Sequence, residues 1–494
     1  MSEAFDVVII GSGIGGLVCG NYLTKTGLKV LLLEQHYLPG GCCSSFQRNA
    51  FTFDSGAHSL GSCREGGQFN RILRELELSE KIDIKRARPS DTVVAHGIRV
   101  DMQGSLETDV DAFAGIFNKD RQGIRELFET IEGFDINSPA IVSRYYRKYS
   151  DITFRSLLDT HLVDQVAKSL LCAFLGNSGL SSFQISALAA IAMFKEFVFD
   201  GGYFVIGGMG QFTNFLARAF RERGGILEYK QKVKRIVVSR GNVEAVIVDG
   251  DRLIKTSCVV SNAGLHETFH NLVGIDQLPV KLRSKTATSI PSVSAFVVYL
   301  GVRGKDLVDS SLGRTVWYTP EGDVDEIYGE TFEGKLDTKA RTLLCAFPSR
   351  FDASLAPEGY STIYLFMVAP FLTESFWRGA KDEMMNALVD RAEGLVPNLR
   401  KKIEFREAAS PHTLHRYTLN DAGAMYGLAS IPSQIRPNVM PQQSQIRGLF
   451  LASHWVTVGA GQGGTPMAAF AGRNAARLIL KNRRALSEQT VISN

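Results

Sequence analysis

The sequence predicts an α/β fold with a mainly parallel sheet, and two observations support this. A strand-like run at residues 6–10 passes into a glycine turn, an apolar helix-like stretch and a second strand-like run at residues 29–33. Two strands joined through a helix pair in parallel, because a crossover returns the second beside the first. The second observation is that the informative glycines form four groups, each next to a strand: residues 11–16, 40–41, 207–210 and 459–464.

Composition excludes several broad classes. The chain has 494 residues, of which 45% are hydrophobic and 21% charged, as in globular proteins. A net charge of +4 is too small to indicate a nucleic-acid partner. Seven scattered cysteines favour neither a disulfide framework nor a structural metal site. Because no apolar run reaches the roughly 18 residues that predict a membrane span, a cytoplasmic protein is expected.

The first glycine turn has the order of parts that binds a dinucleotide. Gly11 allows a tight turn, Gly13 lets the backbone approach a pyrophosphate, and Gly16 lets the helix pack close to the strand. The helix start, at Ile14 and Gly15, offers free amides to the phosphates. An acid follows the second strand at Glu34, where it can bind the ribose. Since an acid there disfavours a 2′-phosphate, the nucleotide is FAD or NAD rather than NADP.

The segment after Glu34 distinguishes these two. It contains Gln35-His36, Gly40-Gly41-Cys42-Cys43 and Phe53-Asp54-Ser55-Gly56, followed by His58. These residues resemble the phytoene desaturase-like FAD oxidoreductases, a branch of the amine-oxidase-type flavoproteins, and within them the retinol saturases and carotenoid cis–trans isomerases. The resemblance implies FAD as cofactor. It also implies a Rossmann-like, glutathione-reductase-type FAD-binding domain interleaved with an α+β substrate domain.

The resemblance recurs along the chain and sets the expected domains. It implies an FAD-binding domain of residues 1–72, 205–290 and 442–494, and a substrate-binding domain of residues 73–204 and 291–441. Similar proteins commonly carry an acid where this chain has His454, so the role of that acid is not carried over. Besides the first glycine turn and Glu34, the FAD contacts implied are Gln35, Gly41, Cys42, Val233, Asn262, His454, Gly463, Thr465 and Pro466.

Two inserts are expected to form the substrate side. The first is mainly helical by pattern, and its residues 169–199 are unusually apolar apart from the interruption at residues 176–180. Three interpretations stay open for this stretch: a buried core helix pair, the wall of a tunnel for a lipophilic substrate, or a contact with the membrane surface. In the second insert, strand-like runs at residues 293–301 and 361–368 are expected to form the floor of the substrate cavity.

The predicted function is FAD-dependent oxidation or reduction of a lipophilic polyene. Desaturation, saturation and cis–trans isomerisation of a carotenoid- or retinoid-like lipid would all use the same site, by hydride or electron transfer at the flavin. The candidates for proton handling are His58, His412 and Tyr417, each of which could instead be a packed or hydrogen-bonded residue. His412 and His415 invite a metal interpretation, but no third ligand has suitable spacing, so no metal is expected.

Two other functions remain open. An amine or cyclic-imine oxidase would place an aromatic pair beside the flavin, and Trp455 next to His454 keeps that alternative alive. A non-catalytic FAD-containing lipid-binding protein is the third. The adjacent Cys42 and Cys43 could perform thiol redox chemistry, although a structural role is favoured because neighbouring cysteines rarely pair. The expected partner is a lipophilic small molecule, with peripheral membrane contact as an extension; the sequence says nothing about oligomeric state.

Overall fold

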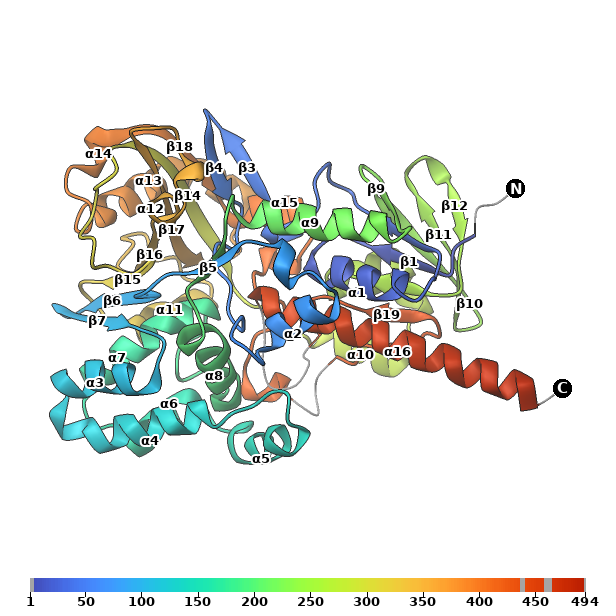
Figure 1. Cartoon of the computed structure of the whole chain (residues 1–494), viewed down its shortest axis with the longest axis horizontal. Helices are drawn as coiled ribbons and strands as arrows, with labels where there is room; N and C mark the ends of the chain where they lie inside the picture. The colour runs from blue at the N-terminus through green and yellow to red at the C-terminus, as the bar shows by residue number, and fades with distance from the viewer. Residues whose placement is uncertain (1–3, 436–439, 457–463, 493–494) are drawn as a thin grey trace.

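A computed structural model describes residues 4–435, 440–456 and 464–492 of the chain, with side chains up to residue 485. Two sheets of different kinds dominate the molecule. A five-stranded sheet lies on one side and a seven-stranded sheet on the other, as Figure 1 shows. Helices of the first insert, drawn in cyan and green, gather below the seven-stranded sheet in that view.

The five-stranded sheet is parallel throughout and confirms the Rossmann-like prediction. Its order is β19 (Leu449–Leu451), β13 (Val259–Ser261), β1 (Val7–Ile10), β2 (Val30–Leu33) and β9 (Ile226–Glu228). These strands come from all three segments expected to form the FAD-binding domain. In β1, Val7 and Ile9 face the helices and Val8 and Ile10 face the opposite side. Because both faces are covered, every residue of the strand is apolar.

Helices cover one face of this sheet and a small antiparallel sheet covers the other. The helices are α1 (Ile14–Thr24), α9 (Met209–Glu222) and α16 (Gly464–Ile492), and the small sheet is β10 (Val233–Ser239), β11 (Asn242–Val248) and β12 (Leu253–Lys255). After α2 (Gln68–Glu75), Leu76 and Leu78 still pack into the core around α1. The dinucleotide part therefore continues a few residues beyond the expected boundary at residue 72.

The seven-stranded sheet is mixed. Its order is β18 (Ile403–Ala409), β14 (Ser294–Arg303), β17 (Tyr360–Ala369), β16 (Leu343–Ala346), β15 (Thr315–Thr319), β6 (Asp91–Ala95) and β7 (Ile98–Met102). Strands β6 and β7 come from the first insert, which had been expected to be mainly helical. In β14, Phe296 and Val298 face α13 (Glu374–Ala392), whereas Val297 and Tyr299 face the interior. This alternation fixes which side chains reach the site.

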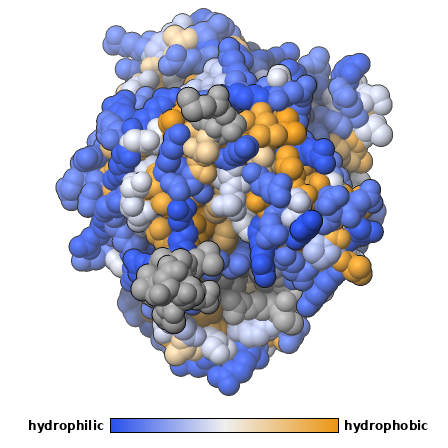
Figure 2. All heavy atoms as spheres, turned by 90° about the vertical axis from the view of Figure 1, so that its right-hand side faces the viewer, coloured by the Kyte–Doolittle hydropathy of each residue, from blue (hydrophilic) through white to orange (hydrophobic). Residues whose placement is uncertain are grey.

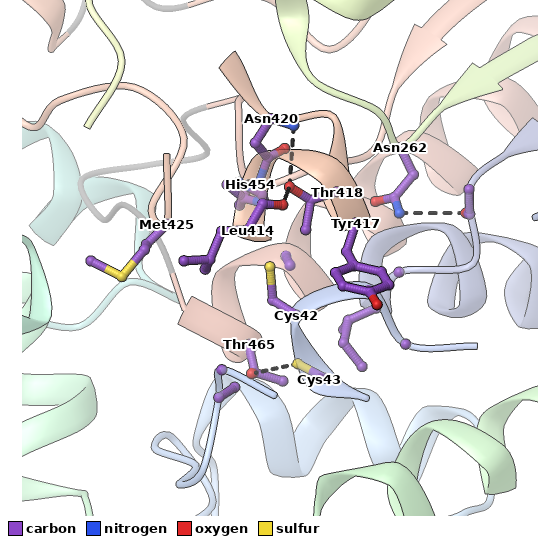
Figure 3. Close-up of a pocket in the computed structure, with 18 of the residues that line it drawn as sticks. Cys42, Cys43, Asn262, Leu414, Tyr417, Thr418, Asn420, Met425, His454 and Thr465 are labelled. Carbon is purple, nitrogen blue, oxygen red and sulfur yellow. Dashed lines mark hydrogen bonds between the residues drawn. The ribbon is translucent and has the colours of Figure 1, made fainter. Parts of the chain in front are cut away.

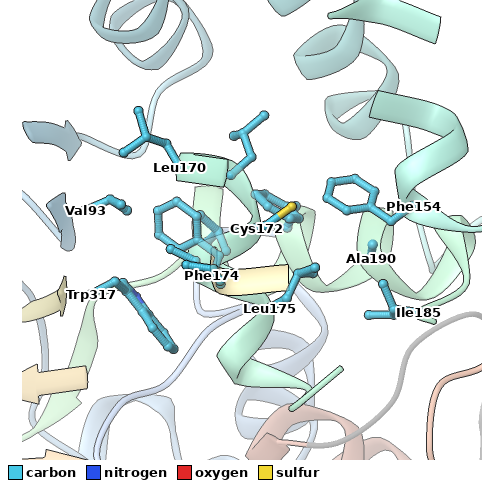
Figure 4. Packing of buried hydrophobic residues seen from close by; sticks show 14 of the residues in the cluster. Val93, Phe154, Leu170, Cys172, Phe174, Leu175, Ile185, Ala190 and Trp317 are labelled. Carbon is cyan, nitrogen blue, oxygen red and sulfur yellow. The ribbon is translucent and has the colours of Figure 1, made fainter. Parts of the chain in front are cut away.

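The apolar stretch at residues 169–199 forms a buried core between the helices and the sheet. Figure 4 shows Phe154, Phe174 and Trp317 packed within it. The elements are α6 (Phe154–His161), α7 (Gln165–Ala173), the short 3-10 helix η4 (Phe174–Asn177), α8 (Ala187–Met193) and the π-helix η5 (Phe194–Phe199). Most of the stretch thus fits the core interpretation. Two of its residues, Asn177 and Phe197, also line the cavity described below.

The surface carries small hydrophobic patches on a mainly hydrophilic background, as seen on the face shown in Figure 2. Among the residues that the structure describes, no helix combines the length and the apolar character needed to cross a bilayer.

Candidate active site

A continuous cavity of about 250 Å³ runs from the glycine turn after β1 to the seven-stranded sheet. Figure 3 shows part of its lining, with Cys42, His454 and Thr465 around one stretch and Tyr417 near another. The nucleotide end is lined by Gly11, Gly13, Ile14, Gly15, Glu34, Gln35, Gly41, Gln231, Lys232, Val233, Asn262, Glu267 and Leu272. The opposite end is lined by His58, Asn177, Phe197, Val297, Trp317, Leu344, Tyr364, Phe366, Met425 and Tyr426.

The glycine turn is shaped by close backbone packing. Gly11 has a φ of +90°, which favours glycine. A Cβ at Gly15 would overlap the carbonyl oxygen of Ala452, and one at Gly16 would overlap the carbonyl oxygen of Gly11. Helix α1 begins after Gly13 with no side-chain cap, so its first amides remain available. Such a helix start, held against the sheet and facing a cavity, fits a pyrophosphate.

Glu34 and Asn262 fix the two sides of this turn. The Glu34 carboxylate accepts hydrogen bonds from the Ser12 amide and hydroxyl, both at 2.7 Å, and from the His36 amide at 2.8 Å. It is 8% exposed and lines the cavity where a ribose would lie. Asn262 satisfies both ends of its amide when it donates to Ala452 O at 2.9 Å and accepts from the Gly13 amide at 3.1 Å. This arrangement fits an adenosine dinucleotide.

Beyond the turn, the cavity passes two cysteines and the start of α16. The Cys43 thiol lies 3.2 Å from the Thr465 hydroxyl, as Figure 3 shows. Burial raises the pKa of Cys42 to about 11 and that of Cys43 to about 12. Both thiols are free and protonated at neutral pH, which supports a structural role over thiol redox chemistry because the thiolate is the reactive form.

His454 lines the cavity at the position where similar proteins carry an acid. Burial lowers its pKa to about 4, so its ring is neutral at physiological pH. The ring Nε2 lies 3.5 Å from the Asn420 amide nitrogen. The neighbouring Trp455 is 2% exposed, donates to Asn420 Oδ1 at 3.0 Å and is not part of the cavity lining. The aromatic pair expected of an amine oxidase is therefore not built with Trp455.

Of the three candidates for proton handling, the structure places one at the substrate end. His58 lines the cavity and packs against Tyr364, with ring centroids 4.9 Å apart. His412 lies outside the lining, where its Nε2 is 2.7 Å from the Leu372 carbonyl oxygen. Tyr417 is 52% exposed and lies at the nucleotide end, where its carbonyl oxygen accepts from Gln35 Nε2 at 3.3 Å. Of the three side chains, His58 is therefore the one placed to meet a substrate.

The electrostatics of His58 limit what it can do. Burial, together with the nearby Arg314 guanidinium, lowers its pKa to about 3. Its Nδ1 lies 3.5 Å from the Gly56 carbonyl oxygen. The imidazole is therefore neutral at physiological pH and a weak base, suited to hydrogen bonding rather than to storing a proton.

Three residues expected to bind the cofactor are not in the lining that the structure describes. Gly16 lies behind the turn, where it packs on Gly11, and Pro466 lies within the first turn of α16. Gly463 falls outside the described residues.

The substrate end uses the two runs expected to form its floor, through Val297 and Phe366, together with side chains of β15 and β16 that the sequence did not indicate. Val297, Trp317, Leu344 and Phe366 come from four strands of the seven-stranded sheet, and Phe197 comes from η5. Within the described lining the acidic side chains are Glu34 and Glu267, both at the nucleotide end. The described residues include no group of three histidine, cysteine or acidic side chains arranged to hold a metal ion.

The nucleotide end of the cavity, here called the cradle, has the features of a dinucleotide site, and the substrate end, here called the chamber, is mainly apolar. This combination is typical of a flavoprotein oxidoreductase, and the sequence comparisons agree. The chain belongs to the flavin-containing amine oxidoreductase family, whose sequence pattern matches residues 14–480. A flavin carried on an adenosine dinucleotide is FAD, which is the cofactor of this protein.

The relatives found by sequence include two groups of enzymes. The chain is 25% identical over 458 residues to prolycopene isomerase 1 of an Oncidium hybrid cultivar, covering 86% of this chain and 76% of that protein. It is 27% identical over 528 residues to human all-trans-retinol 13,14-reductase, covering 93% and 84%. Among solved structures, an oxidoreductase from Methanosarcina mazei shares the fold, with a TM-score of 0.70, 18% identity and coverage of 95% and 99%.

Proposed function

We propose that the protein is an FAD-dependent oxidoreductase acting on carbon–carbon double bonds of an elongated polyene lipid. The observation that carries this is the substrate end of the cavity, which is lined mainly by apolar and aromatic side chains from four strands and η5. Such a surface binds a long unsaturated chain through burial of apolar area. Similarity to a prolycopene isomerase and a retinol reductase supports the same class of substrate.

The side chains of this end position the substrate rather than exchange protons with it. Bound FAD supplies hydride or single-electron transfer. Trp317 and Phe366 exclude water and hold the chain in place. Burial raises the pKa of the Tyr364 phenol well above its usual value, so this hydroxyl stays protonated, and it donates to the Gly56 carbonyl oxygen at 3.3 Å. With His58 neutral, the described lining of this end carries no charged side chain, which suits a hydrocarbon chain.

An amine oxidase is less well supported. An ammonium group entering the chamber would need a counter-ion, and the acids of the described lining lie at the nucleotide end. If amines proved to be the substrates, they would have to bind as neutral bases.

Product analysis distinguishes the polyene reactions. We would incubate FAD-loaded protein with a panel of carotenoids and retinoids, with and without chemical reduction of the flavin, and separate the products for mass measurement. Loss of two hydrogens means desaturation, gain of two means saturation, and an unchanged mass with altered retention means isomerisation. Unchanged polyenes under both conditions, with amines oxidised instead, would reject the proposal.

Peripheral membrane contact remains a further proposal, because such substrates dissolve in lipid. Exposed apolar side chains on the first insert include Val163, which is 82% exposed, and Phe183, which is 59% exposed beneath the Arg155 guanidinium. Apolar side chains next to a cation are typical of surfaces that bind lipid headgroups. Recovery of the protein with liposomes in a flotation assay is expected, and full recovery in the lipid-free fraction would contradict it.

A further inference from the structure

Residues 176–180, which interrupt the apolar stretch at residues 169–199, form a tightly packed turn at the substrate end of the cavity. A Cβ at Gly176 would overlap the Trp317 ring, and the Gly176 carbonyl oxygen accepts a hydrogen bond from the Tyr426 hydroxyl at 3.2 Å. Gly179 has a φ of +66° and packs directly on Val293. These contacts fix the turn, and with it the position of Asn177.

A second, much smaller cavity adjoins this turn. Its volume is about 10 Å³, which is about the space of one water molecule or one hydroxyl oxygen. We call this second cavity the notch. Asn177 and Tyr426 line both the notch and the main cavity. The other residues of the notch are Ser178, Ile185, Ala189, Met193 and Ser430.

Asn177 differs from Ser178 and Tyr426 in that its side chain has no hydrogen-bond partner among the residues that the structure describes. Ser178 Oγ donates to the Leu175 carbonyl oxygen at 2.8 Å, and the Tyr426 hydroxyl donates to Gly176. The Asn177 amide makes no hydrogen bond with any residue that the structure describes, although it offers two donors and an acceptor. Asn177 is partly buried, and a ligand that fills the cavity shields its amide from water. A ligand that brings its own hydrogen-bonding group to this amide is therefore favoured.

We propose that Asn177 binds a hydroxyl or carbonyl oxygen at the end of the polyene substrate, with the rest of the chain lying in the aromatic chamber. The inference rests on the proposed function and narrows it to oxygenated polyenes. A hydrocarbon of the same length leaves the amide unpaired, whereas an alcohol pairs it. The alcohol is therefore expected to bind more tightly than the analogue that lacks the oxygen, by the free energy of about one hydrogen bond.

The test compares two ligands that differ in one oxygen. All-trans-retinol and axerophtene, its analogue with a methyl group in place of the alcohol carbon, would be titrated into the FAD-loaded protein, and binding followed by the change in the flavin absorption spectrum. We expect retinol to bind roughly 3- to 10-fold more tightly. Replacement Asn177→Leu, which keeps the size of the side chain, should abolish that difference by weakening only retinol.

Control variants separate this role from a structural one. Met193→Leu changes the apolar wall of the notch and should leave the preference for retinol intact. Asn177→Ala gives a second measurement should the leucine variant lose its FAD. Equal binding of both ligands to the wild type, or a preference that survives both Asn177 replacements, would overturn the inference and leave the proposed function standing. Failure of the wild type to bind either ligand would reject both.

Discussion

The two ends of the cavity are built in different ways. The nucleotide end is made largely of backbone from short contiguous segments, with the turn around Gly11 and Gly15 at its centre. The substrate end is made of single side chains from strands far apart in sequence, such as Trp317 on β15 and Phe366 on β17. Backbone geometry constrains residue type strongly, whereas a side-chain chamber can be built from many combinations. We therefore expect the residues of the nucleotide end to be shared across the family, and those of the substrate end to vary with the substrate.

The two ends also differ in charge. The nucleotide end presents free amides, Glu34 and Lys232 to a charged cofactor. At the substrate end His58 is neutral, and so is His454 elsewhere in the lining. Each difference can be tested by a substitution that affects one end and spares the other.

The largest effect is expected from Gly15→Ala. The added Cβ would overlap the Ala452 carbonyl oxygen, which is backbone and cannot move aside. We expect loss of nearly all bound FAD, measured as the ratio of flavin to protein absorbance after purification. Gly379→Ala on α13 is the control, because a Cβ there meets no neighbour within 4 Å, and it should stabilise the fold by about 0.5–1 kcal/mol. A Gly15→Ala protein with full flavin content would contradict the assignment of this turn as the binding site of the FAD pyrophosphate.

Glu34→Ala is expected to weaken FAD binding by about 10- to 100-fold, since a charged hydrogen-bond partner of the ribose is lost. Equilibrium titration of the apoprotein with FAD measures the effect. The Ser12 hydroxyl donates to the Glu34 carboxylate and helps to hold it in place, so Ser12→Ala should show a smaller loss in the same direction. An unchanged dissociation constant in Glu34→Ala would place the ribose elsewhere.

The neutral histidines predict how stability depends on pH. The pKa of His58 is lowered in the folded state to about 3, so on acidification the unfolded chain takes up the proton first, below about pH 6.5. Stability from this residue is complete above pH 6.5 and falls by roughly 2 kcal/mol at pH 5. Replacement His58→Asn should remove that part of the slope, measured by denaturant unfolding at pH 7.5 and pH 5. Parallel pH slopes for the wild type and the variant would show that the pKa of His58 is not lowered in the folded state.

Phe366→Leu should affect only the substrate end. We expect polyene binding to weaken about 3- to 10-fold through lost apolar contact, while the flavin content stays that of the wild type. Phe371→Leu, at a position that is 38% exposed and outside the lining, is the matched control. A lowered flavin content in Phe366→Leu would mean that the two ends are not separable.

The smallest effects are expected from His412→Ala and Tyr417→Phe. Both residues lie away from the substrate end, so turnover of a polyene should change less than about twofold. Tyr417→Ala, which removes the ring packed on His36, should instead speed the release of FAD. A tenfold loss of turnover in Tyr417→Phe, with FAD retained, would restore its phenol as a proton-handling group.

The same contrast explains what could be predicted from the sequence. The turn at Gly11 and the acid at Glu34 follow local rules of spacing, and the fold class came from them, whereas the return of the chain at Asn262 was implied by the family resemblance. Strands β6 and β7 form a hairpin through the two-residue loop His96-Gly97, a local pattern that was overlooked among the helix-like runs of this insert. The pairing of β6 with β15 is long-range, and no local pattern shows it. Tyr417 was expected near the flavin, but its place beside Gln35 depends on how α15 (Pro411–Thr418) crosses the cavity.

The most direct test is an anaerobic titration of the flavin absorption band. FAD-loaded protein, first oxidised and then chemically reduced, is mixed with an all-trans polyene alcohol and, separately, with a primary amine. We expect the polyene to bleach or shift the band in at least one of the two redox states, and the amine to leave both unchanged. Bleaching of the oxidised band by the amine, with no response to the polyene in either state, would contradict a chamber built for unsaturated lipids.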